Sequence, residues 1–558
     1  MTKDRLFYLP LGGADEVGMN TYVYGYGPPD RERLIVVDVG VAFPDMESTP
    51  GVDLIFADVS WLAERADRIE AIFITHGHED HVGALGHLWP QLRAAVFARS
   101  FTGHLARRKI EERGLDGKVV KVVRPWPETV PVGPFNVGFA PVSHSIPESS
   151  ALIIDTPAGR IVHTGDFKLD ATPVVGEAFD ESFWTEVGDQ GVHVLTCDST
   201  NVFSPLPGRS EASIEAEIRK LAADASGIFA ATTFASNVAR LKTLASAGAA
   251  AGRSVCLLGR AMRRMVEDSV AAGILTDFPR TISPDEAKSV PREHLMLLVT
   301  GSQGEGRAAS ASLSRGKHLG LELSEGDTFL FSSKTIPGNE RAVLRVVNAL
   351  SKRGVDVIDD TSILYHVSGH ANRPDLDRMH GLLRPRIVVP MHGECRHLKE
   401  HARVATTNGF ASLVAGNGSL VDLTGDVPEV TDHVEAGRIY LDGKVQVGAL
   451  DGVIRKRTRM AMNGHVAVTL FLEGDEPDGG PWADLTGLPG KGVSSKSLGE
   501  VLEKELDRQL ERSLVHGASE DEGLDDRLAD EMRNVVRRIC DAEIGKKPEV
   551  TVLISRSS

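Results

Sequence analysis

The chain alternates short apolar runs with polar clusters, and the spacing of these runs changes along its length. Over residues 1 to about 200 the apolar runs are typical of buried strands with interleaved helices. The strand-like runs are 34–40, 70–76, 135–144, 151–166 and 192–200. Several end in His or Asp, and strand ends are where an α/β sheet usually carries its chemistry. This region therefore predicts an α/β domain with a reactive edge.

From residue 211 the pattern becomes a regular strand–helix alternation. Helical spacing recurs at 211–225, 236–252, 261–275 and 339–354, and short apolar runs precede most of these segments. Such alternation predicts a parallel sheet covered by helices. After residue 361 the earlier pattern of a strand-like run with a polar cluster returns, in YHVSGHANRPD and RIVVPMHGECRHL. The simplest interpretation is a domain at 206–361 inserted into a first domain made of 1–205 and 362–430.

The C-terminal part predicts a linker at 431–464 and a small α/β domain at 465–558. Two amphipathic helices are expected between a first and a last strand. One apolar face comprises Leu498, Val501, Leu502, Leu506, Leu510 and Leu514, and the other Leu524, Leu528, Met532, Val535, Val536 and Ile539. No ligand-type cluster lies here, so packing, oligomerisation and RNA contact all remain open, with oligomerisation favoured.

Composition bears on the binding partners and the cellular compartment to be expected of the protein. Lys and Arg number 62 against 78 Asp and Glu, a net charge of −16, which counts against a general nucleic-acid binder. It does not exclude a groove made locally positive by divalent metals. The four cysteines form no CxxC pair and no apolar run approaches ~20 residues, so we expect a cytoplasmic protein without a membrane segment.

The densest chemistry lies in ITHGHEDHVGAL at 74–85. His76, His78, Asp80 and His81 are imidazole and carboxylate ligands that suit Zn²⁺ or Mn²⁺. A short turn cannot wrap all four around one ion without strain. We therefore expect two ions, one held by His76 and His78 and the other by Asp80 and His81. Glu79 alternates with these ligands and is expected to point away.

Three more ligand candidates close other apolar runs, namely His144, Asp166 and His392. Asp166 is the natural bridging carboxylate, with one oxygen for each ion. Two neighbouring metals can activate water and stabilise both the attacking and the leaving oxygen of a phosphoryl displacement. Asp38, at the end of LIVVDVG, is expected to orient ligands rather than bind a metal.

These motifs resemble a known fold. HGHEDH, His144, the Asp of TGDF and the His of MHGE together are similar to the metallo-β-lactamase superfamily, which implies an αββα sandwich with a two-metal site at one edge. That superfamily contains lactamases, glyoxalases, flavoproteins and nucleases. The resemblance therefore implies a chemistry and leaves the substrate open.

The insertion narrows the resemblance to the β-CASP nucleases. Asp198 in CDSTN, His370 in HVSGH and His392 in MHGE follow the order of that family's motifs, and a histidine at the last position favours RNA over DNA. LGGADEVGMN, TGDFKLD, TGSQGE and SSKTIPGNE further resemble the ribonuclease J family. The similarity covers residues 1 to about 455 strongly and the C-terminal domain loosely.

The resemblance implies endonucleolytic and 5′-to-3′ exonucleolytic cleavage of RNA, with a preference for a 5′-monophosphate, in RNA maturation (rRNA processing included) and decay. Two divalent ions are implied, with Zn²⁺ favoured and Mn²⁺ as the alternative, and a homodimer or homotetramer is expected. The residues assigned to catalysis are Asp80, His81, Asp198 and His370.

Phosphate contacts are expected from two motifs. Ser368, Gly369 and His370 form a compact donor cluster, with His366 beside it, and Gly allows close backbone approach. Lys334 and Asn339 lie on the SSKTIPGN turn before a helix, although that motif alone would be an ordinary connection. Arg260, Arg307 and Lys334 are candidates to meet the RNA backbone.

Two alternatives remain. A small-molecule metallo-hydrolase of lactamase or glyoxalase type would explain the ligands but not the insertion or HVSGHA. A metal-bound RNA-binding scaffold without catalysis would predict a broken ligand set, and the set is complete in this sequence.

Overall fold

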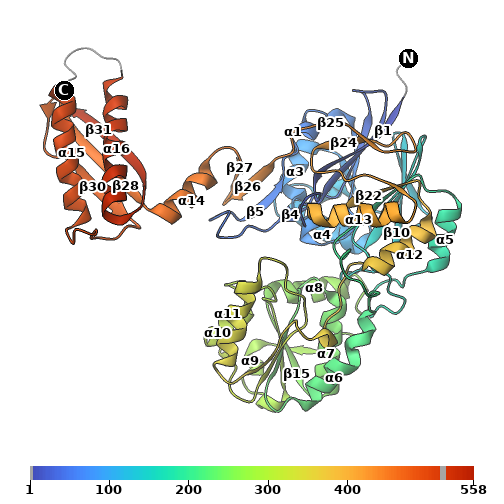
Figure 1. Cartoon of the computed structure of the whole chain (residues 1–558). Helices are drawn as coiled ribbons and strands as arrows, with labels where there is room; N and C mark the ends of the chain where they lie inside the picture. Colours follow the sequence, from blue (N-terminus) through green and yellow to red (C-terminus); the bar gives the residue numbers. More distant parts are fainter. Residues whose placement is uncertain (1–3, 475, 516–522, 558) are drawn as a thin grey trace. The chain divides into compact units, whose positions relative to one another are not determined.

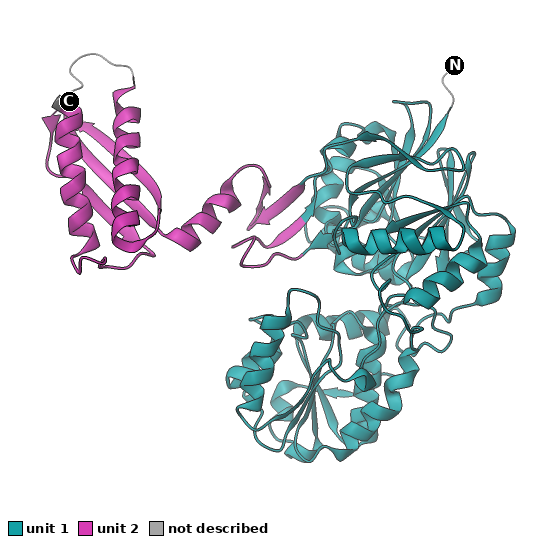
Figure 2. Ribbon diagram, in the orientation of Figure 1, with its two compact units in different colours: residues 1–42, 56–437 teal, residues 43–55, 438–558 magenta. Residues whose placement is uncertain are grey.

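The computed structural model describes residues 4–474, 476–515 and 523–557, and these fall into two compact units (Figure 2). The first comprises Met1–Ala42 and Phe56–Gly437, and the second Phe43–Ile55 and Arg438–Ser558. The assignment of 43–55 to the second unit has no signal in the hydrophobic pattern. Asp53 joins that segment to the C-terminal part, since its N–H donates to the Leu441 carbonyl at 2.8 Å.

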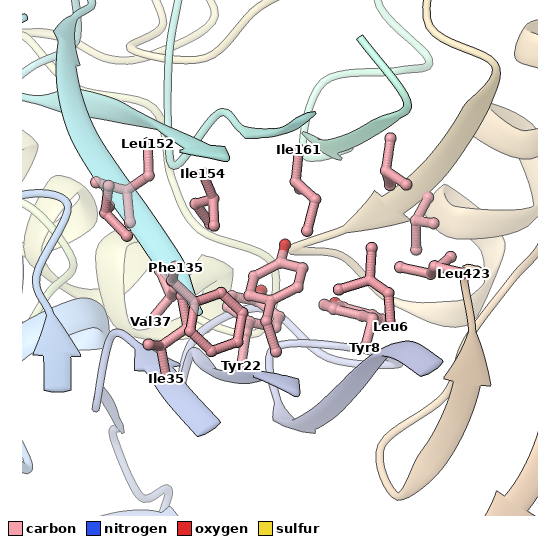
Figure 3. Close-up of a cluster of buried hydrophobic side chains, with 14 of the residues drawn as sticks. Leu6, Tyr8, Tyr22, Ile35, Val37, Phe135, Leu152, Ile154, Ile161 and Leu423 are labelled. Atoms are coloured by element: carbon pink, nitrogen blue, oxygen red, sulfur yellow. The ribbon is translucent and has the colours of Figure 1, made fainter. Parts of the chain in front are cut away.

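The first unit contains two mixed sheets, which lie on either side of the buried side chains drawn in Figure 3. In spatial order the eight-stranded sheet contains β25 (Glu429–His433), β24 (Ser419–Asp422), β1 (Arg5–Gly12), β2 (Thr21–Gly27), β3 (Arg33–Val37), β6 (Ile69–Phe73), β7 (Ala95–Ala98) and β8 (Val120–Val122). The seven-stranded sheet contains β23 (Ala411–Ser412), β22 (Ile387–Met391), β13 (Val194–Asp198), β12 (Gly159–His163), β11 (Ser150–Thr156), β10 (Phe135–Pro141) and β9 (Thr129–Val132).

The core between these sheets is built from alternating strand positions. Tyr8, Tyr22 and Ile35 from the first sheet meet Leu152 and Ile154 from the second (Figure 3). Because successive strand residues point to opposite faces, the intervening residues face the outer helices. The run 151–166, expected as strand throughout, is an antiparallel hairpin of β11 and β12.

Helices cover the outer faces (Figure 1). Those that follow strands of the first sheet are α3 (Leu85–Leu92) and α4 (Ser100–Glu111), and those on the second sheet are α5 (Glu181–Asp189), α12 (Arg373–Leu383) and α13 (Cys395–Thr407). Trp184 of α5, Leu376 of α12 and Val404 of α13 pack against Leu195 and Val388. The arrangement is the expected αββα sandwich.

The chain leaves the sandwich after β13 to form the inserted domain and rejoins the sandwich with α12 and β22. Strands β13 and β22 are parallel neighbours, with Asp198 paired to Met391. Its sheet contains β16 (Thr281–Ile282), β15 (Ser254–Leu258), β17 (Leu295–Val299), β14 (Phe229–Thr232), β20 (Thr328–Phe331) and β21 (Asp356–Ile358), all parallel. Six α-helices accompany it: α6 (Glu215–Asp224), α7 (Val238–Ala250), α8 (Arg260–Ala271), α9 (Pro284–Ala287), α10 (Ala309–Arg315) and α11 (Glu340–Ser351). Separate apolar clusters lie on the two faces, with Leu298 in one and Leu297 in the other.

The second unit ends in a sheet of β29 (Glu476–Pro477), β28 (His465–Glu473), β30 (Trp482–Thr486) and β31 (Glu549–Ser557). Helices α15 (Leu498–Val515) and α16 (Leu524–Ile544) cover one face of this sheet, and their apolar stripes form its core. The predicted linker contains a hairpin of β26 (Arg438–Asp442) and β27 (Val445–Gly448), followed by a basic helix, α14 (Val453–Asn463). None of the described helices combines the length and the apolar character that a membrane span requires.

The packing of α15 gives a test of this small core. We expect Leu506→Ala, at a fully buried position, to lower the free energy of unfolding of the C-terminal unit by about 2–5 kcal/mol, because it removes apolar contacts and leaves a cavity. Val493→Ala is the control, since Val493 is 81% exposed in the same unit, and should cost under about 0.5 kcal/mol. Urea titration of both variants measures this difference. Equal losses would show that α15 is not packed as described.

Candidate metal centre

Seven predicted ligands converge at one edge of the sandwich. The segment after β6, which includes the short helix α2 (Glu79–Val82), supplies His76, His78, Asp80 and His81. The other three follow β10, β12 and β22, and are His144, Asp166 and His392. Their donor atoms form two groups, and within each group the atoms lie within 4.8 Å of one another. One group is His76, His78, His144 and Asp166, and the other is Asp80, His81, Asp166 and His392.

Asp166 belongs to both groups, as a bridging carboxylate must. Its Oδ2 lies 3.3 Å from His81 Nε2 and 3.6 Å from His144 Nε2, while its Oδ1 lies 3.2 Å from His392 Nδ1. The side chain is 2% exposed. The two-group division matches the assignment of His76 and His78 to one ion and of Asp80 and His81 to the other.

Hydrogen bonds at the outer ring nitrogens orient the histidines. Asp38 accepts from His81 Nδ1 at 2.7 Å and from the Thr75 hydroxyl at 2.8 Å. Because that hydroxyl donates to Asp38, its oxygen accepts from His76 Nδ1 at 3.0 Å. These bonds turn the Nε2 lone pairs of both histidines inward, and Asp38 therefore has the orienting role expected of it. His144 Nδ1 donates to the Gly369 carbonyl at 2.7 Å, with the same effect.

Burial and charge set the protonation of the ligands. Burial lowers the pKa of His76 and His144 well below the usual value, and that of His78 to about 4, so these imidazoles are neutral donors. Burial opposes ionisation of Asp166, but the neighbouring His392 and His81 hold its pKa well below the usual range. Asp166 and the other nearby carboxylates in turn raise the pKa of His81 and His392, so these two ligands would release their extra proton on binding a metal. Neutral imidazoles and ionised carboxylates are the forms that bind a metal.

Two glycines allow the segments to approach this closely. A Cβ on Gly40 would lie 1.6 Å from the Asp80 carbonyl oxygen, so no other residue fits against the ligand turn. Gly165, with φ +55°, would bring a Cβ 3.1 Å from the Thr75 Cβ. His392 itself has φ +51°, an uncommon conformation for a residue with a side chain, of the kind found at functional sites.

The residues present fit two divalent ions. Asp166 Oδ1 and His392 Nε2 are buried without a hydrogen-bond partner among the described residues, and buried polar atoms are normally paired. His78 Nδ1 lies 3.1 Å from the Nε2 atoms of both His76 and His144, whose Nδ1 atoms already have partners. Three inward-facing nitrogens with a carboxylate form a donor set for a cation rather than a hydrogen-bonded core.

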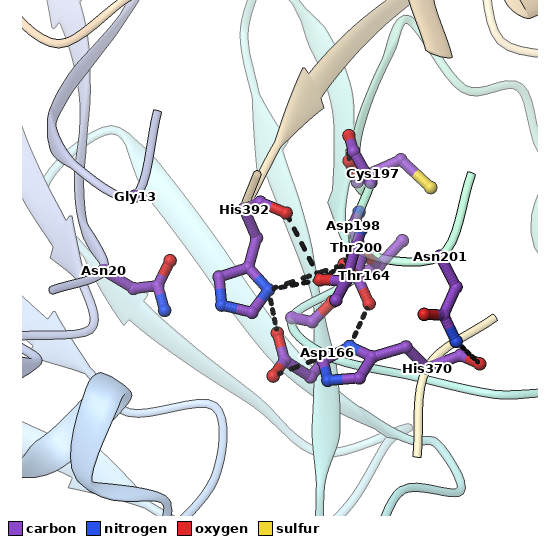
Figure 4. A network of polar contacts seen from close by, with 12 residues as sticks. Gly13, Asn20, Thr164, Asp166, Cys197, Asp198, Thr200, Asn201, His370 and His392 are labelled. Atoms are coloured by element: carbon purple, nitrogen blue, oxygen red, sulfur yellow. Dashed lines mark hydrogen bonds and ion pairs between the residues drawn. The ribbon is translucent and has the colours of Figure 1, made fainter. Parts of the chain in front are cut away.

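A third group of side chains adjoins the ligands (Figure 4). His370 Nδ1 donates to Asp198 Oδ2 at 2.7 Å, and Asp198 Oδ1 accepts from the Thr200 N–H and hydroxyl at 2.9 and 2.7 Å. The Thr200 hydroxyl oxygen also lies 2.9 Å from His392 Nδ1. Burial opposes a charged His370, but Asp198 and Asp166 raise its pKa. The edge therefore carries a histidine that holds its proton beside the metal ligands.

Comparison with known proteins covers most of the chain. Residues 15–199 match the metallo-beta-lactamase superfamily, and residues 362–414 match the Zn-dependent metallo-hydrolase RNA specificity domain. Residues 227–350 match the ribonuclease J beta-CASP domain, and residues 452–557 the ribonuclease J C-terminal domain. A relative named ribonuclease J, from Sinorhizobium meliloti, is 39% identical over 99% of this chain and 98% of its own length. The chain belongs to the ribonuclease J family.

Further relatives in this family extend the similarity. Proteins named ribonuclease J from Mycolicibacterium smegmatis and Thermus thermophilus are 36% and 35% identical, over 83% and 85% of this chain and 82% and 84% of their own lengths. A crystal structure from Enterococcus faecalis, titled a protein of unknown function, matches with a TM-score of 0.51 at 16% identity, over 75% of this chain and all of its own. That structure supports the fold. The metallo-hydrolase family matches support divalent metal binding.

The residues predicted to contact phosphate fall into two places. Ser368 and Gly369 adjoin the centre, since Ser368 Oγ accepts from Asn201 Nδ2 at 2.7 Å and Gly369 supports His144. His366 lies behind them, with Nδ1 3.3 Å from the buried Arg240.

Lys334 and Asn339 lie in the inserted domain and make their contacts there. Lys334 pairs with Asp360 at 3.4 Å, and Asn339 Nδ2 donates to Gln303 at 3.3 Å. Within the described part of the chain, neither forms a hydrogen bond or ion pair with the ligand histidines. Arg260 and Arg307 are exposed.

Three residues of the site were not predicted. Asn20 Nδ2 donates to the Asp80 carbonyl at 3.0 Å and lies 3.0 Å from His81 Nε2. Thr200 joins Asp198 to His392, and Asn201 Nδ2 donates to the Ser368 hydroxyl. All three lie inside recognised motifs, LGGADEVGMN and CDSTN, which gave their position but not their partners.

Metal content tests the shared carboxylate. We expect Asp166→Ala to reduce bound divalent metal from two ions per chain to fewer than one, because both ligand groups lose a donor. His144→Ala should reduce the content by about one ion. Mass spectrometry of the purified chain after zinc loading and desalting measures both.

Glu79→Gln provides the control for this measurement. The Glu79 carboxylate is bonded through both oxygens to Lys109 Nζ, at 2.6 and 2.7 Å, and is 47% exposed. We expect this variant to keep two ions. Loss of metal in Glu79→Gln, or its retention in Asp166→Ala, would contradict the ligand assignment.

Proposed function

We propose that the chain is a ribonuclease that hydrolyses RNA phosphodiester bonds at this centre with two divalent ions, zinc favoured over manganese. The observation that carries the proposal is the Asp198–His370 pair beside Asp166, with His370 Nδ1 4.0 Å from Asp166 Oδ2. It supplies a proton donor next to the carboxylate that both ligand groups share. The RNA specificity match at 362–414 supports RNA as the substrate.

Each residue group then has a defined task. His76, His78, His144 and Asp166 would hold one ion, and Asp80, His81, His392 and Asp166 the other. When bound, such ions supply Lewis-acid stabilisation of the phosphate charge and lower the pKa of water. Asp38 and Gly369 fix the ring orientations, so that the lone pairs stay aimed inward.

The leaving 3′-oxygen needs a proton when the phosphodiester breaks. His370 is assigned this step, because Asp198 binds its Nδ1–H and leaves the opposite ring nitrogen for the leaving group. Asp198 and Asp166 raise the pKa of His370, which favours the protonated form that this step needs. Asp198 acts through His370 by fixing its orientation and stabilising its charge.

RNA contacts complete the proposal. Ser368, Gly369 and His366 are assigned to phosphates near the centre, and Lys334, Asn339, Arg260 and Arg307 to the RNA elsewhere. We infer endonuclease activity together with 5′-to-3′ exonuclease activity that favours a 5′-monophosphate, in RNA maturation, including rRNA processing, and in decay. The cytoplasm is the expected location, which four unpaired cysteines suit.

We also infer a homodimer or homotetramer, with the open sheet face of the C-terminal unit as the contact. The apolar stripes of α15 and α16 are buried in the core of their own unit, so they are not exposed for contact with a second chain. On the opposite sheet face, Trp482 and Leu553 both pair with Thr469 and are 58% and 57% exposed. An exposed apolar row of this kind is typical of an interface.

Cleavage of defined RNA tests the function. With Zn²⁺ or Mn²⁺ supplied, we expect the chain to degrade 5′-monophosphorylated RNA faster than 5′-triphosphorylated RNA, and a chelator to abolish both reactions. We expect His370→Ala to lower kcat by about 10²–10⁴-fold, the usual contribution of a positioned proton donor. Gel analysis of end-labelled RNA separates exonuclease from endonuclease products.

Controls distinguish the alternatives. Asp80→Ala and His81→Ala should lose cleavage and keep the far-ultraviolet circular dichroism of the wild type. A wild-type chain that binds RNA but leaves it intact would be a scaffold, and one that turns over a β-lactam or a thioester instead would be a small-molecule hydrolase. Either result rejects the ribonuclease.

The interface has its own test. We expect Trp482→Glu to shift the chain from dimer or tetramer toward monomer in sedimentation velocity, because it places a charge in the apolar row. Asp507→Asn, at an exposed position of α15 on the other side of the sheet, is the control and should not change the sedimentation coefficient. An unchanged oligomer in Trp482→Glu would place the interface elsewhere.

A further inference from the structure

A buried polar chain lies beneath the metal centre, among the apolar contacts of α12 and α13. It consists of His380 on α12, His401 on α13 and Ser199 after β13, and all three are 0% exposed. His380 Nε2 lies 3.1 Å from His401 Nε2, and His401 Nδ1 lies 2.9 Å from Ser199 Oγ. None of the three belongs to the ligand groups or to the proposed proton donor.

The proton positions along this chain follow from one atom. His380 Nδ1 is buried without a hydrogen-bond partner in the described structure. An unpaired buried N–H is rarer than an unpaired acceptor, so the lone pair belongs there and Nε2 carries the hydrogen. His380 Nε2–H then donates to His401 Nε2, and His401 Nδ1–H donates to Ser199 Oγ. Burial lowers the pKa of both rings, to about 4 for His380, which keeps both neutral.

A metal ion is the alternative occupant, because Cys197 Sγ joins the two histidines within 4.8 Å. The ring geometry favours the hydrogen bond. The two imidazole planes are nearly parallel, at 11°, and the ring centroids are 5.2 Å apart. Because the two Nε2 atoms are only 3.1 Å apart, each points toward the other along the line between the rings. Burial also raises the pKa of the Cys197 thiol well above its usual value, which favours the protonated form that does not bind metal.

The row of hydrogen bonds from His380 through His401 ends at Ser199, which lies between two residues of the proposed catalytic edge, Asp198 and Thr200. Ser199 lies between Asp198, which holds His370, and Thr200, which contacts both Asp198 and His392. Helix α13, which carries His401, starts three residues after His392. The His401–Ser199 bond therefore ties the helix behind His392 to the loop behind Asp198.

We propose that His401, oriented by His380, is a positioning residue for RNA cleavage: its Nδ1–H holds Ser199, and so keeps Asp198 and Thr200 in place against His370 and His392. The proposal rests on the ribonuclease function and deepens it. Loss of an ordinary core residue would weaken the fold. For a positioning residue, we expect the loss of His401 to change the catalytic edge without weakening the fold.

Two substitutions at one position make the test. His401→Phe keeps a ring of similar size and removes the donor to Ser199. His401→Asn keeps an N–H near the position of Nδ1. We expect His401→Phe to lower kcat for RNA about tenfold with KM within twofold of wild type, and His401→Asn to retain most of kcat.

Metal affinity gives a readout that does not depend on RNA. We expect His401→Phe to weaken binding of one of the two ions about tenfold in a chelator competition, since residues that orient a ligand have effects of this order. His401→Asn should stay near wild type, and the melting temperature of His401→Phe should not fall below that of His401→Asn. His87→Phe is the matched control, because His87 stacks on Phe56 at 5.4 Å, outside the site, and should change neither readout.

A double substitution tests whether His401 acts through Ser199. Ser199→Ala combined with His401→Phe should be no worse than the more damaging single variant, because both remove the same bond. Wild-type kcat and metal affinity in His401→Phe would overturn the positioning role, as would His401→Phe and His401→Asn losing activity in parallel with melting temperature. A third tightly bound ion, lost in Cys197→Ala, would replace the hydrogen bond with a metal site. Wild-type protein inactive on RNA would reject the ribonuclease alone, and the metal affinities would still decide the role of His401.

Discussion

The carboxylate of Asp166 is the constraint on which the rest of the site depends. A fully buried charge without compensation is very costly, and this one is compensated only because histidines from three separate strand ends surround it. Each of those histidines must in turn be held by an outer partner, such as Asp38 or Gly369. The two packed sheets supply this precision, since strand ends anchored in a common core cannot drift apart.

The same requirement explains why glycine and unusual backbone conformations gather here. Gly40 touches the Asp80 carbonyl, and His392 and Asp38 both have positive φ. These features cost stability locally and persist because surrounding packing fixes them. In the C-terminal unit, by contrast, α15 and α16 follow a plain apolar stripe, and nothing in its described part demands special geometry.

Strand–helix alternation predicted the inserted parallel sheet, and strand ends with His and Asp predicted the candidate ligands. The sandwich was predicted from the resemblance of those motifs to the metallo-β-lactamase superfamily. His76, His78, Asp80 and His81 could be divided between two ions from their spacing alone. Asn20, Thr200 and the His380–His401 pair could not be found this way, because their roles depend on partners 21 to 202 positions away. The joining of 43–55 to the C-terminal part was missed for the same reason, since it rests on pairing across the chain. The linker at 431–464 was predicted from its Gly and charge content, and helix α14 inside it was not predicted.

The placement of the insertion between two neighbouring parallel strands has a consequence for synthesis. Asp198 leaves the sandwich on β13, whereas His370 and His392 arrive only on the returning segment. In a growing chain on the ribosome, six of the seven candidate ligands are translated by residue 166, whereas His370, the proposed proton donor, and His392, the seventh candidate, follow only when about two-thirds of the 558 residues have been made. Because the inserted segment is translated before His370 and His392, the proposed catalytic edge can be completed only after residue 392 has been made.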